Sequence, residues 1–119
     1  DDLSISYEYS LMYFYYGTIV RPQLKLVDTW MKLTNAKLGG KISQTKFMEL
    51  TKKLSNPHQF IFNDPISGKQ TTFTQEYAQS INEKVMTDVT FRDRIVIEWT
   101  RAAEARYDNV LTELKSLTG

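Results

Sequence analysis

The sequence predicts a mainly α-helical fold, namely an antiparallel helical bundle with two long terminal helices, shorter helices between them, and a small β-hairpin or extended insertion near residues 59–73. Two observations lead to this prediction. In the first and last thirds of the chain, apolar residues recur mostly at intervals of three or four, which is the helical period. Residues 59–73 lose this period and contain Asp64-Pro65 and Gly68, which are residue types that favour turns.

The size and composition of the chain indicate one folded domain. Its 119 residues suffice for a single core, and we expect one helical domain over residues 1–119. Hydrophobic residues make up 41% and the net charge is +1, so disorder and a strongly basic nucleic-acid-binding surface are both disfavoured. Helical patterns reach both ends of the chain. We therefore expect either a processed protein or a segment excised from a longer one.

The first helical segment is expected from about Leu3 to Leu38. Pro22 interrupts it and predicts a kink or break within Thr18–Pro22, because proline lacks a backbone N–H and clashes with the preceding turn. Gly39 and Gly40 are expected to end the segment. The apolar residues that define its helical period are Ile5, Tyr9, Met12, Tyr16, Ile19, Leu24, Val27, Trp30 or Met31, and Leu38.

A short helix is expected next, over roughly Thr45–Leu54, with Ser43 or Thr45 as its N-cap. Asn56-Pro57 should stop it, because the residue before a proline avoids the helical conformation. The hairpin or extended insertion follows, and an Asx turn is the simplest reading of Asn63 and Asp64.

The last part of the chain predicts two helices. Thr72 to Gln75 matches a capping box, and the helix that it opens carries apolar residues at intervals of four. Thr87-Asp88 breaks this pattern, and residues 90–93 resemble a second cap that opens a long helix to about Leu117. The apolar face of the long helix consists of Phe91, Ile95, Trp99, Ala102 or Ala103, Val110, Leu114 and Leu117.

Trp30 and Trp99 are expected on the inner faces of the two long helices, as core residues. The two terminal helices are expected to lie antiparallel and adjacent. The charged side of the last helix, which includes Glu98, Arg101 and Asp108, is expected to form surface ion pairs.

Several chemistries find no support in the sequence. The chain has no cysteine, which excludes disulfides and thiolate zinc sites, and its single histidine, His58, rules out a cluster of histidine ligands. We find no catalytic constellation and no phosphate-binding loop, so we expect no enzyme activity, no metal site and no cofactor.

The candidate binding residues are Tyr9, Tyr13, Tyr15 and Tyr16, in a segment without charge from Tyr9 through Val20. Tyrosine is enriched where a surface is apolar yet partly wet. Three interpretations remain open: a buried helix whose hydroxyls reach water, a protein interface, and a small-molecule pocket.

The favoured functional hypothesis is a non-enzymatic binding or sensing domain, one form of which is the extracytoplasmic helical domain of a membrane-anchored protein. The alternatives are a structural subunit that docks through the Tyr-rich helix and a small nucleic-acid-binding regulator. A protein partner or self-association is expected and a small-molecule ligand is compatible. Nucleic acid is disfavoured, and membrane attachment would require sequence outside this segment. Extracytoplasmic and cytoplasmic locations are both compatible with the composition.

Overall fold

The structure is a computed structural model that describes residues 7–55 and 60–119. It confirms a mainly helical fold, a bundle with one small two-stranded antiparallel hairpin, in a molecule of 50 × 28 × 23 Å. The predicted helix start near Leu3, the Asn56-Pro57 stop and His58 lie outside the described residues.

The first segment is a broken helix of three parts: α1 (Glu8–Tyr15), the π-helical turn η1 (Tyr16–Val20) and α2 (Gln23–Leu38). The predicted interruption near Pro22 is confirmed. The Arg21 N–H donates to the Tyr16 carbonyl at 2.9 Å, five residues back, which is the π-helical pattern. Beyond Leu38 the chain turns at Gly39 and Gly40, and Gly40 has φ of 72°, a value that glycine adopts without strain.

Helix α3 (Gln44–Ser55) begins after Ser43, whose hydroxyl oxygen accepts the Lys46 N–H at 3.0 Å. Ser43, one of the two predicted N-caps, therefore holds this position. Strands β1 (Ile61–Asn63) and β2 (Gln70–Thr72) form the predicted hairpin, in a register that pairs Phe62 with Thr71.

The caps of the last two helices differ from the prediction. Helix α4 (Gln75–Thr87) is capped by Thr74, which accepts the Tyr77 N–H at 3.1 Å, because Thr72 is still paired in β2. Helix α5 (Val89–Thr118) is capped by Asp88, which accepts the Phe91 N–H at 3.0 Å. The predicted cap at residues 90–93 already lies inside the first turns of α5.

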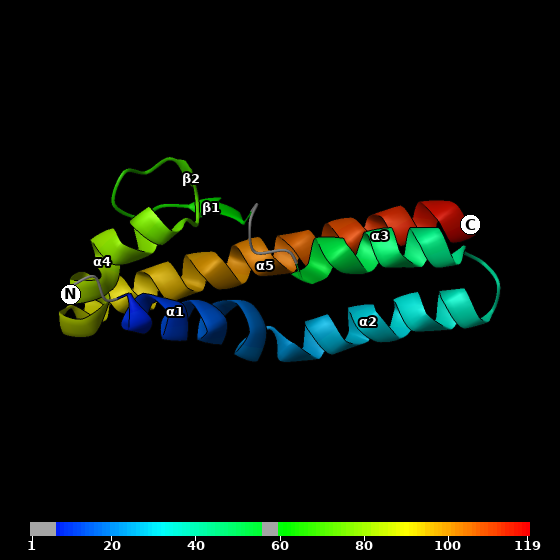
Figure 1. The fold of residues 1–119 in the computed structure, drawn as a ribbon, viewed down its shortest axis with the longest axis horizontal. Coiled ribbons are helices and arrows are strands. Elements are labelled where there is room, and N and C mark those ends of the chain that lie inside the picture. Colours follow the sequence, from blue (N-terminus) through cyan, green and yellow to red (C-terminus); the bar gives the residue numbers. More distant parts are fainter. Residues whose placement is uncertain (1–6, 56–59) are drawn as a thin grey trace.

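Helix α5 is the axis of the molecule, and every other element except β2 packs along it (Figure 1). The expectation that the two long terminal segments run antiparallel is wrong: α1–η1–α2 and α5 run in the same direction. Contacts advance together along both segments, from Gly17 with Thr100 to Lys25 with Asp108. The reason is that α3, the hairpin and α4 return the chain along the full length before α5 begins. Helix α1 and the C-terminus therefore lie toward opposite ends of the molecule (Figure 1).

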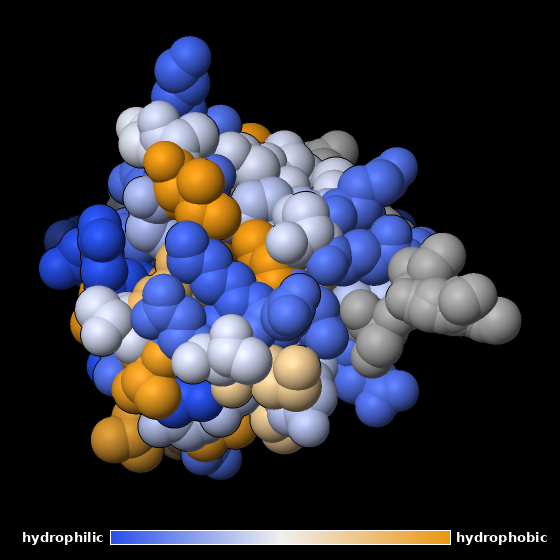
Figure 2. Space-filling view, turned by 90° about the vertical axis from the view of Figure 1, so that its left-hand side faces the viewer, coloured by the Kyte–Doolittle hydropathy of each residue, from blue (hydrophilic) through white to orange (hydrophobic). Residues whose placement is uncertain are grey.

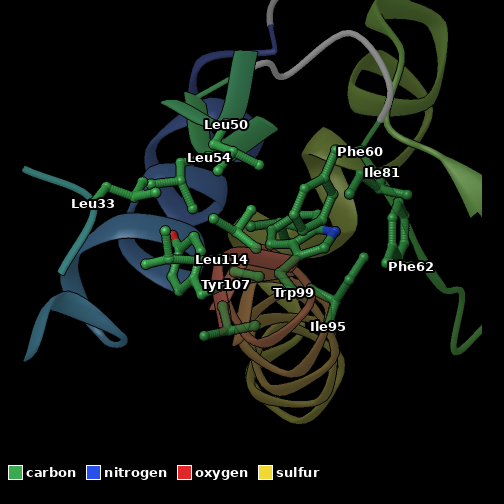
Figure 3. Close-up of a cluster of buried hydrophobic side chains, with 14 of the residues drawn as sticks. Leu33, Leu50, Leu54, Phe60, Phe62, Ile81, Ile95, Trp99, Tyr107 and Leu114 are labelled. Atoms are coloured by element: carbon green, nitrogen blue, oxygen red, sulfur yellow. The ribbon is translucent and has the colours of Figure 1, made fainter. Parts of the chain in front are cut away.

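The core forms around the inner side of α5. Trp99 is fully buried, as predicted, and lies beside Phe60 and Phe62 (Figure 3). Its ring also meets Phe14 and Phe73 edge to face, with centroids 5.2 and 5.6 Å away. Members of the core cluster that Figure 3 labels are Leu33, Leu50, Leu54, Phe60, Phe62, Ile81, Ile95, Trp99, Tyr107 and Leu114.

Candidate interaction surface

The four predicted tyrosines do not gather at one site. Tyr9 and Tyr16 are exposed, and Tyr16 lines a hollow that it shares with Arg92 and Asp93 of α5. Tyr15 is also exposed, but lines a recess toward the end of α3. Tyr13 is half-buried, and the guanidinium of Arg92 lies 5.0 Å from the centre of its ring. Three of the four tyrosines are therefore exposed, while Tyr13 belongs partly to the packing between α1 and α5.

Small residues let α1–η1 approach α5 closely. A Cβ on Gly17 would lie 3.2 Å from the Val96 carbonyl oxygen and 3.3 Å from the Trp99 Cβ, tighter than ordinary contact. Thr18 is buried beside Gly17. The side of the segment that meets the rest of the chain is therefore partly built from small and polar residues, and buries few of its large apolar side chains.

Helix α5 supplies hydrogen bonds to the π-helical turn. The Thr100 hydroxyl donates to the Gly17 carbonyl at 2.7 Å, and the Tyr107 hydroxyl donates to the Thr18 carbonyl at 2.6 Å. Pro22 lacks the N–H that would serve the Thr18 carbonyl in a regular helix. Burial raises the pKa of Tyr107, which keeps its phenol protonated and able to donate. The Thr18 carbonyl, which Pro22 deprives of its helical donor, thus accepts a hydrogen bond from a side chain near the other end of the chain.

A second polar contact holds the start of α1. The Ser10 N–H, in the first turn, donates to the Asn82 side-chain oxygen at 3.0 Å, and the Ser10 hydroxyl donates to the Ala78 carbonyl at 2.6 Å. The first N–H groups of a helix have no partner within the helix. Asn82 of α4 therefore acts as a cap from outside, and Ser10, Ala78 and Asn82 are all buried.

The apolar residues of this segment point outward. We define the outer stripe as the exposed residues of α1–η1–α2 that recur at intervals of three or four: Tyr9, Met12, Tyr16, Val20, Leu24, Val27 and Met31. Leu24 is 88% exposed. Trp30, predicted on the inner face, is 37% exposed, because Thr29 and Leu33 take the inward positions of α2. Figure 2 looks at the end of the molecule where α1 and α4 lie and shows hydrophobic residues at the surface there.

The helical period in this segment is evident in the sequence, but five members of the stripe are not among the predicted binding residues: Met12, Val20, Leu24, Val27 and Met31. A signal was present. Ser10, Gly17, Thr18 and Thr29 lie on the opposite side of the segment and are all buried. A row of small residues opposite a row of large apolar ones indicates close packing on the small side.

A recess of about 280 Å³ lies beside Tyr15, between α1–η1, the end of α3 and α5. Its walls are mostly apolar, and the guanidinium of Arg106 lies 5.4 Å from the Phe60 ring at one wall. Arg106 also donates to the Lys53 carbonyl at 3.4 Å. The recess could take an apolar side chain or a small apolar ligand, and its other lining residues include Leu11, Phe14, Ile19, Leu54 and Ala103.

The one buried carboxylate among the described residues has a structural role. Asp64 accepts the Ile66 N–H at 3.1 Å, the predicted Asx turn, and the Tyr77 hydroxyl at 2.7 Å. Burial acts to raise the pKa of Asp64, but these hydrogen bonds outweigh it and hold the pKa below its usual value. Burial and the bond to Asp64 raise the pKa of Tyr77 well above its usual range. The pair ties the hairpin turn to α4.

The charged residues of α5 form ion pairs at the surface. Glu98 and Arg101 pair at 2.9 Å, as predicted. Asp108 reaches across to Lys25 of α2 at 2.7 Å. Glu113 meets Lys46 and Lys53 of α3 at 2.7 and 2.8 Å, and these hydrogen bonds hold the pKa of Glu113 below its usual value. Such exposed pairs fix the orientation of neighbouring helices more than they stabilise the fold.

Comparisons with protein-family models, with curated proteins and with solved structures find no match. Within residues 7–55 and 60–119, no three histidine, cysteine or acidic residues are grouped to hold a metal ion. No helix in the described part of the chain has the length and apolar character needed to cross a membrane.

Proposed function

We propose that this chain is a non-enzymatic interaction domain that binds a helical partner along the outer stripe. The observation that supports the proposal most is the orientation of α1–η1–α2: Ser10, Gly17, Thr18 and Thr29 take inward positions beside Phe14 and Leu33, while seven large apolar side chains are exposed. Burying large side chains and exposing small ones would favour the isolated domain. Leaving the large apolar side chains of the stripe exposed costs stability unless another surface covers them.

The spacing of the stripe favours a helix as the partner. The seven exposed side chains recur at intervals of three and four along about 23 residues, a spacing typical of helices that pack side by side. No charged residue interrupts the ridge between Tyr9 and Val20. A helix with its own apolar ridge would bury both rows.

The composition of the stripe favours a reversible contact. Tyrosine and methionine predominate over leucine and isoleucine, and both suit surfaces that are wet part of the time or that adapt to a partner. A structural subunit, the alternative function, would use the same stripe. In that case the partner would cover the stripe permanently, whereas an interaction domain would bind it reversibly. A sensing role would use the recess beside Tyr15 as well.

Position-specific photo-crosslinking in the cells that make this protein tests the proposal. A photoreactive phenylalanine analogue at Tyr16 or Met31 should yield a discrete covalent adduct with a protein. The matched control is Met48 of α3, which is also exposed and apolar but lies outside the stripe. Adducts from the stripe positions and not from Met48 support an interaction domain. Equal yields at all three positions, or none at Tyr16 and Met31, contradict it.

A further inference from the structure

We propose that the partner of the outer stripe is a second copy of this chain, paired antiparallel about a two-fold axis near Val20. This inference rests on the proposed function and names its partner. A two-fold interface uses one self-complementary patch twice, so a single patch must match itself when reversed. The outer stripe has this property in both its spacing and its terminal charges.

The spacing of the stripe is nearly the same in both directions from Val20. Steps of three, four and four lead from Tyr9 to Val20, and steps of four, three and four lead from Val20 to Met31. Reversal about Val20 places Tyr16 opposite Leu24, each four residues from the centre, and Tyr9 opposite Met31, each eleven residues from it. Each ridge therefore meets a ridge along its whole length.

The charges at the ends select the antiparallel direction. Glu8 precedes the stripe and Lys32 follows it, each twelve residues from Val20, and both are exposed. An antiparallel pair brings Glu8 of one copy to Lys32 of the other, twice by symmetry. A parallel pair would bring like charges together at both ends, which disfavours it.

Three charged residues lie between Glu8 and Lys32, and each has a place beside the stripe. Lys25 is directed to Asp108 of α5, at 2.7 Å. Asp28 is paired with Lys32 on the same helix, at 3.0 Å. Arg21 lines a hollow beside Tyr16, together with Arg92 and Asp93 of α5. The ridge between Glu8 and Lys32 thus stays apolar.

The available area is sufficient for a specific dimer. Seven side chains that each expose on the order of 100 Å² provide most of the roughly 800 Å² that each partner contributes to a standard interface. The contact would be of standard size and not as extensive as an obligate one. We therefore expect a dimer that forms reversibly in the micromolar range.

Sedimentation of the purified chain tests whether it pairs with itself. The expected result is a mass that rises to twice that of the chain as its concentration rises through the micromolar range. Leu24→Glu should weaken the pairing at least about tenfold, since each interface contains the substitution twice. Met48→Glu is the matched control and should leave the pairing unchanged. A chain that remains monomeric, or a dimer that Leu24→Glu does not weaken, overturns the inference.

The absence of cysteine allows the direction to be mapped with single introduced thiols. With a short bis-maleimide linker, Val20→Cys protein should cross-link to itself. Tyr9→Cys should cross-link poorly alone but well when mixed with Met31→Cys. Efficient self-linking of Tyr9→Cys would instead indicate parallel pairing and overturn the proposed geometry.

Two outcomes separate this inference from the proposed function. A purified monomer that still gives photo-adducts with a different protein at Tyr16 overturns the second copy as partner and leaves the interaction domain standing. A monomer that co-sediments with phosphatidylcholine–phosphatidylglycerol vesicles, and loses this with Leu24→Glu, assigns the stripe to a lipid surface and overturns both.

Discussion

The Tyr107 hydroxyl donates a 2.6 Å hydrogen bond to the Thr18 carbonyl, joining residues 89 apart in the sequence. Both groups are buried. The carbonyl lacks a regular helical donor because Pro22 stands four residues later. One side chain of α5 thus allows a proline to stand within a helix that packs against the core.

Tyr107→Phe removes this donor and leaves the Thr18 carbonyl buried without it. We expect a loss of about 1–3 kcal/mol in the free energy of unfolding, the usual cost of an unsatisfied buried polar group. Urea denaturation followed by circular dichroism measures it. Tyr9→Phe removes an exposed hydroxyl and should change stability by less than about 0.5 kcal/mol. Equal effects of the two substitutions would contradict the role given to Tyr107.

The two tryptophans should differ sharply in their contribution to stability. Trp99→Ala opens a cavity inside the aromatic cluster, and we expect a loss of roughly 3–5 kcal/mol. Trp30 is 37% exposed, so Trp30→Ala should cost about 1 kcal/mol or less. Thermal melts of both variants beside the unmodified chain provide the comparison. A Trp30→Ala loss as large as that of Trp99→Ala would refute the observed orientation of α2.

Asp64 should make stability depend on pH in the acid range. Its pKa is lowered in the folded state, so its contribution is present above the ordinary aspartate pKa of about 4. The contribution is lost as the pH falls from there through the folded-state pKa. Asp64→Asn should therefore be less stable than the unmodified chain at pH 7, and the difference should shrink by pH 3. Urea midpoints at both pH values test this, and a constant difference would contradict it.

Substitutions on the outer stripe should separate association from folding. Tyr16→Glu and Met12→Glu place charges on the exposed ridge, and should abolish association while changing stability by less than about 0.5 kcal/mol. Tyr13→Glu should instead lower stability, because Tyr13 is half-buried beneath Arg92. Sedimentation and circular dichroism on each variant distinguish the two effects. Unfolding by Tyr16→Glu would show that the stripe belongs to the core.

Reversing the terminal charges provides a further check on the antiparallel dimer. Glu8→Lys places two lysines together at each end and should weaken the dimer severalfold, as expected for exposed ion pairs. Adding Lys32→Glu restores opposite charges and should recover much of the affinity. Because Lys32→Glu also loses the pair with Asp28, the informative comparison is the double variant with Glu8→Lys alone. No recovery in the double variant would contradict the assigned register.

Much of the fold could be read from local pattern. Pro22, Gly39 and Ser43 mark the boundaries of their elements through backbone chemistry that acts within a few residues, and the structure places those boundaries there. The buried position of Trp99 followed from a regular period along one helix. The caps at Thr74 and Asp88 were misplaced because several adjacent residues could fill each role.

The direction of the terminal helices and the orientation of α1–η1–α2 could not be read in this way. A helical period shows that one side of a helix is apolar, but not whether that side meets its own chain or another molecule. Two residues determine which side of this segment faces its own chain: Ser10 hydrogen-bonds to α4, and Gly17 lies in close contact with α5. These partners are far away in the sequence, so no local pattern names them. Of the candidate residues, Tyr9 and Tyr16 belong to the stripe and Tyr13 does not.

The parallel arrangement of the two long segments has a consequence for how the chain folds. Ser10, Gly17 and Thr18 find their partners 68 to 89 residues later. During synthesis, α1–η1–α2 leaves the ribosome well before α5 exists, so the Gly17 and Thr18 carbonyls of its π-helical turn lack their α5 donors until then. Long-range closures of this kind slow folding and prolong the exposure of unpaired surfaces. The amino-terminal segment therefore cannot complete these hydrogen bonds until α5 has been made, and its π-helical turn is open to chaperones until then.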